Sequence, residues 1–182
     1  MNTKDLIFLK GDTIYLRSLL ESDVEGNYIK WLNDQEVVQF NSHGRFPFTK
    51  EKLLEYVRSV KHSNEILVFA IIDLKTDNHI GNISLQSINW IDRNAEIAFI
   101  LGEKDFWSKG IMYEAGTILL THAFTVLNLH RVYCGTSSEN IGMQKLAIKL
   151  GMTKEGERID AIFKNGNYYS IYEYGIINKI KL

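Results

Sequence analysis

The sequence predicts an α+β fold, because stretches with the two-residue period of strands alternate with stretches of helical period. Branched and aromatic residues dominate 66–73, 79–88 and 95–101, and turn-forming sequences separate these stretches. They predict three consecutive antiparallel strands. After Gly110 the apolar spacing changes to that of a long helix that ends near Leu127. The full predicted order is strand, two helices, three strands, helix, strand, helix and two strands.

The first strand and the first two helices are predicted upstream of this block. Residues 13–19 alternate apolar and polar side chains and predict a strand, and a helix is expected over about 23–32. Thr49 is the predicted N-cap of the second helix, with Phe48 before it and Leu53 after it at the spacing of a hydrophobic staple.

The C-terminal part predicts a strand, a short helix and a closing hairpin. The strand is expected over 131–137 and the helix over 141–150. Asn165-Gly166 lies between strand-like stretches at 161–164 and 168–177, and this dipeptide tolerates the positive φ angles of a tight turn.

Length and charge restrict the classes of function. A chain of 182 residues fits one domain, 1–182. Its 21 Lys and Arg residues balance 22 Asp and Glu residues, so no overall field attracts nucleic acid or anionic lipid. Neither a signal-peptide pattern nor an apolar stretch of about 20 residues is evident. We therefore expect a cytoplasmic protein, monomeric or homodimeric, with no nucleic-acid or membrane partner.

The one cysteine, Cys134, lies in an apolar alternating run. A buried strand thiol is the favoured interpretation, and a catalytic nucleophile is the alternative. No disulfide within the chain and no bound metal are expected.

The junction over 95–115 carries the strongest chemical signal. A strand leads through Gly102 and the loop up to Gly110 into the long helix. A glycine-bearing loop at a helix start exposes unpaired backbone N–H groups and the positive end of the helix dipole, which suits a pyrophosphate. A strand-to-helix connection without a ligand is the alternative.

This junction resembles the acetyl-CoA motif of GNAT acetyltransferases, especially the branch with ribosomal-protein N-terminal acetyltransferases. The resemblance covers roughly residues 12–177. The matching segments are Ala95-Glu96-Ile97-Ala98-Phe99, Trp107 to Ala115, Phe124 to Val132, Asn140 with Lys149 to Gly156, Tyr15 to Leu19, Trp31 to Asp34 and Ile80-Gly81.

The resemblance implies a mixed, mostly antiparallel sheet of about seven strands with about four helices, in which two strands splay apart at the acetyl-CoA site. Acetyl-CoA is then the cosubstrate. The residues that the resemblance assigns to it are Phe99, Ile100, Leu101, Trp107, Ser108, Lys109, Gly110, Ile111, Met112 and Asn140.

Three positions depart from the pattern of the family. Met112 stands where relatives prefer Gly or Ala, and Met143 replaces a common Ser. Ala147 stands where many relatives have the tyrosine that protonates the leaving thiolate. Together they keep a non-catalytic CoA-binding or metabolite-binding module as an alternative.

Acetyl transfer to an amine needs a base, a positioned thioester and no covalent enzyme intermediate. Glu96 is the first candidate base, and a surface carboxylate paired with Arg93 or Arg131 is its alternative. His43 is the second candidate, with a solvated loop residue as its alternative. Candidates for the general acid are Tyr133, Ser138 and Tyr168.

The acceptor should be set by the first two helices and their loop, over 31–52, where polar groups are interleaved with aromatic ones. Trp31, Asn41 and Arg45 are the candidate binding residues. This region resembles enzymes that acetylate amino-sugar nucleotides, which is the first substrate hypothesis. A protein N-terminus, as on a ribosomal protein, is the rival, and a polyamine ranks third.

Overall fold

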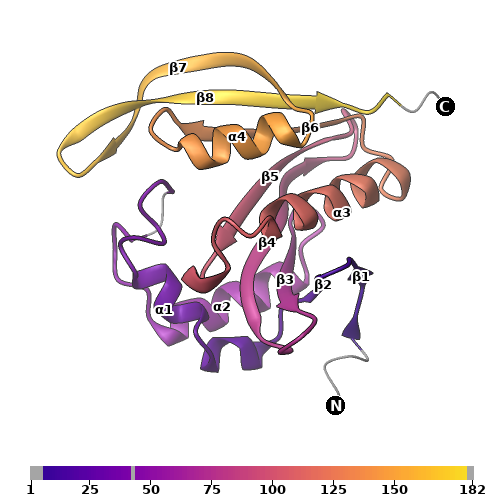
Figure 1. Cartoon of the computed structure of the whole chain (residues 1–182), viewed down its shortest axis with the longest axis vertical. Coiled ribbons are helices and arrows are strands. Elements are labelled where there is room, and N and C mark those ends of the chain that lie inside the picture. The colour runs from indigo at the N-terminus through magenta and orange to yellow at the C-terminus, as the bar shows by residue number, and fades with distance from the viewer. Residues whose placement is uncertain (1–5, 42–43, 180–182) are drawn as a thin grey trace.

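The protein is built around one mixed β-sheet (Figure 1), as shown by a computed structural model that describes residues 6–41 and 44–179. In these residues the sheet has eight strands in the order β1-β2-β3-β4-β5-β6-β8-β7. The strands are β1 (Leu9–Lys10), β2 (Ile14–Ser18), β3 (Leu67–Asp73), β4 (His79–Asn89), β5 (Asn94–Leu101), β6 (Arg131–Ser137), β7 (Thr153–Lys164) and β8 (Asn167–Ile177).

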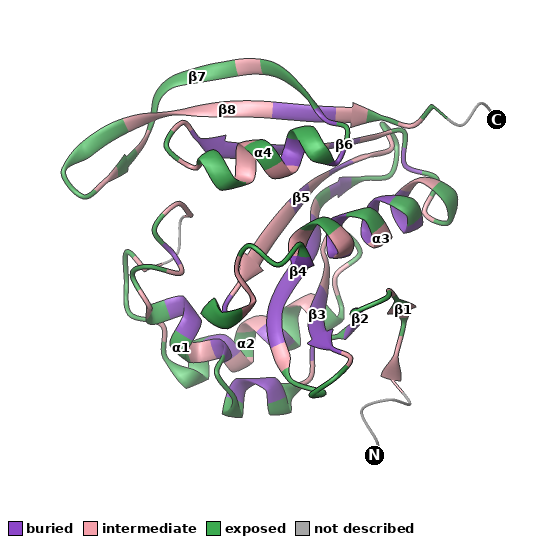
Figure 2. Cartoon of the chain, viewed as in Figure 1, coloured by how far each residue is buried: buried purple, intermediate pink, exposed green. Residues whose placement is uncertain are grey.

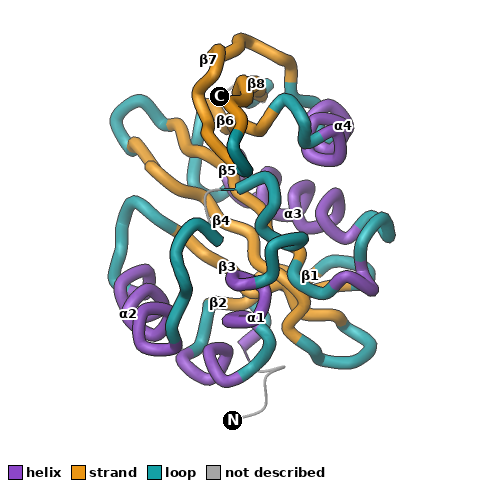
Figure 3. The backbone as a smooth tube through the Cα atoms, turned by 90° about the vertical axis from the view of Figure 1, so that its left-hand side faces the viewer, coloured by secondary structure: helices purple, strands orange, loops and turns teal. Residues whose placement is uncertain are grey.

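Helices cover both faces of the sheet (Figure 3). The α-helices of the described residues are α1 (Tyr28–Asn33), α2 (Lys50–Lys61), α3 (Ile111–Thr125) and α4 (Ile141–Lys149). Residues of α1 and α2 share one apolar cluster with β2 and β3, whereas α3 and α4 contribute to a second cluster with the central strands. None of these helices is long and apolar enough to cross a membrane.

The only parallel pair among the described strands is β5 with β6, and it is short. It covers Asn94 to Glu96 on β5 against Arg131 to Tyr133 on β6. Beyond Glu96, β5 remains paired with β4 as far as Leu101, but it has no partner on the side of β6. The sheet therefore opens into a wedge between two adjacent strands.

The predicted fold class is confirmed, with differences in three elements. A two-residue strand, β1, raises the strand number to eight, because so short a pair leaves no periodic signal. The helix expected over 23–32 is divided at Gly26 into a 3₁₀ turn, Glu21–Glu25, and α1. β7 begins at Thr153 rather than near 161, and its mostly exposed side chains (Figure 2) give no alternation of burial.

Two local predictions are confirmed. The Thr49 hydroxyl accepts a hydrogen bond from the Lys52 N–H at 3.3 Å and so caps α2. Asn165 and Gly166 have φ angles of 51° and 82°, so both central residues of the β7–β8 turn are left-handed.

A buried ion pair fixes the 3₁₀ turn to the sheet. Arg17 on β2 makes two hydrogen bonds to the Asp23 carboxylate, at 2.7 and 2.8 Å, and Asp23 also accepts one from the Leu20 N–H at 2.8 Å. Burial by itself would raise the pKa of Asp23, but the Arg17 hydrogen bonds and the nearby His79 outweigh it and lower that pKa. The ionised carboxylate thus contributes to stability at neutral pH.

Replacing Asp23 by Ala should lower the free energy of unfolding by about 3–5 kcal/mol, because Arg17 would remain buried without a partner. Glu21→Ala is the matched control, since Glu21 and Arg58 form an equally short pair, 2.7 Å, whose side chains are 52% and 59% exposed. We expect that change to have a much smaller effect, because water and salt screen an exposed pair. Chemical denaturation at pH 7 measures both values, and equal losses would contradict the role of burial.

Candidate active site

The wedge between β5 and β6 opens into a cleft with a cavity volume of about 840 Å³. Its walls come from segments far apart in the chain: β4, β5, β6, the start of α3, α4, the loop after α1 and the β7–β8 hairpin. Figures 1 and 3 show that the hairpin and α4 lie on one side of this opening and α1 and α2 on the other.

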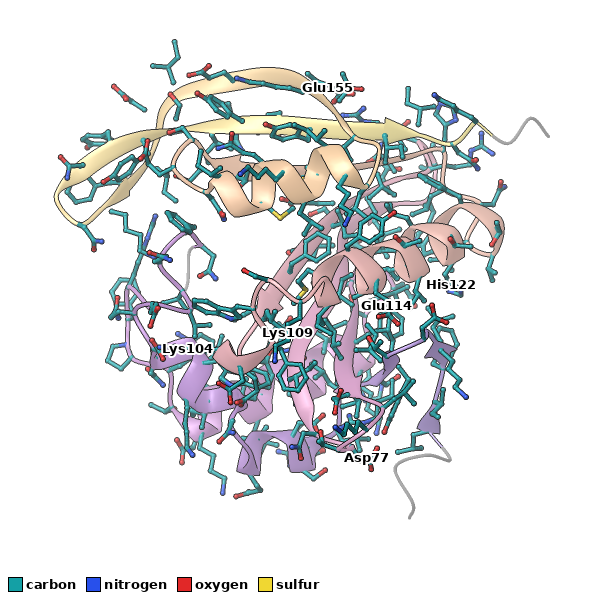
Figure 4. All side chains as sticks on the ribbon, viewed as in Figure 1. Asp77, Lys104, Lys109, Glu114, His122 and Glu155 are labelled. Atoms are coloured by element: carbon teal, nitrogen blue, oxygen red, sulfur yellow. The ribbon has the colours of Figure 1, made fainter. Side chains whose placement is uncertain are left out.

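The acetyl-CoA motif lies along one wall of this cleft. Nine of its ten predicted cofactor residues line the cleft, namely Phe99, Ile100, Leu101, Trp107, Ser108, Gly110, Ile111, Met112 and Asn140. Lys109 does not; its ammonium group lies 5.7 Å from the centre of the Phe106 ring, in the loop before α3 (Figure 4). The motif therefore reaches the cleft through its backbone and its uncharged side chains.

Backbone conformation brings the start of α3 to the cleft. Ser108 and Gly110 have φ angles of 61° and 82°, and the Trp107 indole N–H donates to the Leu101 carbonyl at 2.9 Å. The first N–H groups of a helix have no partner within the helix, so this turn offers them to an anion. The Met112 side chain packs against the apolar cluster, so the departure at this position leaves the backbone N–H groups accessible.

Two lysines that the sequence analysis did not select also line the cleft. Lys145 and Lys149 lie one helical turn apart on α4 and so share a face. The Lys149 ammonium is 4.3 Å from the centre of the Tyr113 ring, at the start of α3. Their spacing of four residues was the available signal, and they place positive charge in the cleft wall, which Lys109 does not line.

Glu96 lies at the point where the strands separate, and within residues 6–41 and 44–179 no ion pair to its carboxylate is formed. It lines the cleft, and within the described residues Arg131 pairs with Glu155 while Arg93 hydrogen-bonds to Asn128. Burial raises the pKa of Glu96, and the negative charge of Glu173 raises it further, while Arg158 and the Gly135 N–H offset only part of this. A half-buried carboxylate with a raised pKa is suited to accept a proton near neutral pH.

The other predicted acid–base residues do not reach the cleft, or cannot be placed. Tyr133 lies beside Glu96 in the sheet but is not part of the cleft wall, and its ring lies 5.6 Å from the Arg131 guanidinium. Ser138 and Tyr168 are also outside the wall. His43 lies outside the described residues.

Among the predicted acceptor residues, only Asn41 lines the cleft. Trp31 is buried, donates from its indole to Glu103 at 2.9 Å and packs on Gly102, where an added Cβ would lie 1.8 Å from the ring. Arg45 donates to the Phe163 carbonyl at 3.2 Å. Trp31 is therefore part of the core, and exposed Arg45 contacts the hairpin, both outside the cleft wall. An alternation of polar and aromatic residues cannot distinguish such positions from ligand-binding ones.

Cys134 is a buried strand thiol, as predicted. Its exposed fraction is 1%, and burial raises the pKa of its thiol to about 12, with Glu96 and Glu173 adding to the effect. At pH 8 only about 1 in 10⁴ such thiols is ionised. Although Cys134 lines the cleft, its burial and raised pKa disfavour a role as nucleophile.

Comparison with known proteins identifies the family. The family model described as "Acetyltransferase (GNAT) domain" matches residues 13–153, which is more than half of the chain. The chain belongs to the GNAT acetyltransferases. It is 29% identical over 177 residues to the probable N-acetyltransferase YjcK of Bacillus subtilis, covering 93% of this chain and 97% of that protein.

Two further relatives carry names that bear on the acceptor. The putative ribosomal N-acetyltransferase YdaF of Bacillus subtilis is 30% identical over 54% of each chain. The crystal structure of spermidine N-acetyltransferase from Vibrio cholerae in complex with CoA and spermine superposes with a TM-score of 0.83, at 26% identity, and covers 92% of this chain and 97% of that one. None of these three names supports the amino-sugar hypothesis.

The enzyme is therefore an acetyl-CoA-dependent N-acetyltransferase, and the walls of its cleft suit this donor. Backbone N–H groups at the start of α3 would face a pyrophosphate, and the unpaired edge of β5 would face the amides of the pantetheine arm.

The lysines of α4 should contribute to CoA affinity. We expect Lys145→Met and Lys149→Met each to weaken the binding of CoA about two- to fivefold, and the effect should diminish as salt rises. Lys154→Met, which removes the same charge from β7 outside the cleft, should leave the dissociation constant unchanged. Isothermal titration calorimetry at two salt concentrations tests this, and three equal dissociation constants would exclude the role.

Proposed function

We propose that the enzyme transfers the acetyl group to the primary amine of a small molecule, and that Glu96 is the general base. The observation that carries the proposal is the half-buried Glu96 carboxylate in the wall where β5 and β6 separate, which has no ion-pair partner among the described residues. The reacting amine would lie beside Glu96, on the side of the cleft formed by β4, α1 and α2.

Direct attack on the thioester accounts for the reaction. An amine bound as its ammonium form transfers a proton to Glu96, and its nitrogen lone pair then attacks the thioester carbonyl carbon. The tetrahedral intermediate collapses, the C–S bond breaks, and the second proton of the amine passes to the departing thiolate, so that the neutral amide and the CoA thiol are formed. A thiolate with a pKa near about 8.5 is a good leaving group, so the reaction does not depend on the tyrosine that Ala147 replaces.

A bridge across the acceptor side supports a small molecule over a protein N-terminus. The Lys164 ammonium, near the tip of the hairpin, donates to the carbonyls of Val38 and of Asn41, the latter at 3.0 Å. Arg45 adds its hydrogen bond to the Phe163 carbonyl at 3.2 Å. These contacts tie the loop after α1 to the hairpin, so a folded protein would have to displace the bridge to present its terminus.

A polyamine is the second candidate, because a structural relative is named for spermidine and was solved with spermine. The cleft itself offers little to a polycation. Its carboxylates, in the part of the chain that the structure describes, are Glu36 and Glu96, and Glu36 is paired with Lys104. A bound triamine would thus find one unpaired carboxylate for its ammonium groups.

Replacing Glu96 by Gln should lower kcat by about 10²- to 10⁴-fold and leave the affinity for CoA within about twofold. Because the base must be deprotonated, the wild-type rate should rise with pH through the raised pKa of Glu96, and the variant should lack this limb. Release of CoA thiol, measured from pH 5 to 9 over a panel of amines, tests both expectations. An unchanged profile would exclude Glu96 as the base.

Removing the hydrogen bonds of Lys164 should change the KM for the amine acceptor but not the KM for acetyl-CoA. We expect Lys164→Met to raise KM for the amine acceptor about tenfold, with the KM for acetyl-CoA unchanged, because two hydrogen bonds that hold the loop are lost. Lys154→Met on the same strand is the control. If the wild type acetylates peptide N-termini faster than small amines and Lys164→Met has no effect, the bridge does not enclose the acceptor.

A further inference from the structure

We infer that the acceptor is an amine whose skeleton carries hydroxyl groups, as an amino sugar does, and that it is bound by a strip of uncharged polar side chains on β4 together with two tyrosines. This inference rests on the proposed function, since it assigns the molecule that would present its amine to Glu96. The strip is formed by Asn82, Ser84 and Gln86, and the tyrosines are Tyr28 and Tyr56.

The strip is a continuous feature of one sheet face. Asn82, Ser84 and Gln86 alternate along β4, so their side chains point the same way, and all three line the cleft. Gln86 lies directly across from Glu96 in the β4–β5 register. The strip therefore runs from the proposed base toward α1 over about 13 Å, which is the length of four residues of strand and exceeds one sugar ring.

The two tyrosines face the strip from the helices. Tyr28 comes from α1 and Tyr56 from α2, and both line the cleft. Burial raises the pKa of Tyr28, and the neighbouring Tyr56 raises it further, while the Asn82 amide offsets only part. Burial also raises the pKa of Tyr56. Both hydroxyls therefore keep their protons and can donate hydrogen bonds throughout the working pH range.

Much of the hydrogen-bonding capacity of this group is unused. The Gln86 amide donates to the Ser84 hydroxyl at 2.9 Å, and the Asn82 oxygen accepts from His79 at 2.8 Å. The Asn82 amide lies close enough to the Tyr28 hydroxyl to lower the pKa of Tyr28, but its nitrogen makes no hydrogen bond of good geometry to the residues described. The Tyr56 hydroxyl likewise makes no hydrogen bond to any residue that the structure describes. Unpaired polar groups that are withdrawn from water cost free energy, which a ligand with matching groups would recover.

The chemistry of the strip selects the class of ligand. Hydroxyl groups both donate and accept, and so they match a mixture of amides and hydroxyls. A plain polyamine offers only N–H donors and positive charges. It can donate to the oxygens of the tyrosine hydroxyls, but it provides no acceptor for the Asn82 nitrogen or for the tyrosine O–H donors. The strip contains no charge, and Glu96 at its end is the one group suited to the amine.

The wild-type enzyme should prefer a hydroxylated amine. Acetylation of D-glucosamine, cyclohexylamine and spermidine is compared by release of CoA thiol, with each rate expressed per neutral amine so that basicity does not enter. We expect kcat/KM for glucosamine to exceed both others by tenfold or more. A preference for cyclohexylamine or spermidine that depends on Glu96 would overturn the inference and leave the proposed function standing.

Removing single hydroxyls tests the contacts themselves. Tyr28→Phe and Tyr56→Phe should each raise KM for glucosamine about five- to tenfold, while the KM for cyclohexylamine and the affinity for CoA stay constant. Tyr168→Phe, which removes a hydroxyl outside the cleft, is the control, and thermal unfolding verifies that each variant is folded. If Tyr28→Phe does not fold, Ser84→Ala takes its place. Equal effects on both amines would overturn the inference.

Binding separates this inference from the proposed catalytic role. Calorimetry measures the affinity of glucosamine for the CoA-loaded enzyme, without turnover. Binding of glucosamine that weakens in Tyr56→Phe but is unchanged in Glu96→Gln would support the strip as the acceptor site, even if no amine were acetylated. In that case the proposed catalytic function would be wrong while the inference about binding would stand. Absence of both binding and turnover would overturn both.

Discussion

The separation of β5 from β6 is the constraint on which the rest of the structure depends. The two strands are parallel and paired over only three residues, and β5 then continues for five residues with a partner on one side alone. An unpaired strand edge inside a protein is costly unless something satisfies its backbone groups. Here the opening is bounded by the start of α3, whose own N–H groups are unpaired as well. The separation of the two strands thus brings together the two sets of backbone groups that would bind acetyl-CoA: the unpaired edge of β5 and the N–H groups at the start of α3.

The same opening determines the properties of the groups beside it. Glu96 is the last residue of β5 that pairs with β6, so it is half-buried and close to Glu173, and none of the residues that the structure describes forms an ion pair with it. Cys134, across the wedge, is buried, and burial together with the charges of Glu96 and Glu173 raises the pKa of its thiol further above neutral pH. Burial and the charge of Glu173 thus act in the same direction on both residues, and residue type decides the outcome: the pKa of a carboxyl moves toward neutral pH, whereas the pKa of a thiol moves away from it.

The acceptor side depends on a second constraint, the buried Arg17–Asp23 pair. It holds the 3₁₀ turn that leads into α1, and His79 lies 3.8 Å from Asp23 while hydrogen-bonding to Asn82. The orientation of a cleft residue is thereby connected to an ion pair in the core. Through His79, the buried ion pair helps to fix the orientation of Asn82, which has few hydrogen-bond partners of its own.

The sequence by itself determined the features that depend on local backbone geometry. These include the order of the long elements, the Thr49 cap, the Asn165-Gly166 turn and the acetyl-CoA motif, nearly all of which lines the cleft. Only the tertiary structure decided which segments meet around the cleft, the burial that raises the pKa of Glu96, and the positions of Trp31 and Arg45 outside the cleft wall. The physical reason is the range of the interactions. A cap or a phosphate-binding turn is made by neighbours in the chain, whereas Lys164 meets Asn41 across 123 positions, and no local pattern reports such a contact.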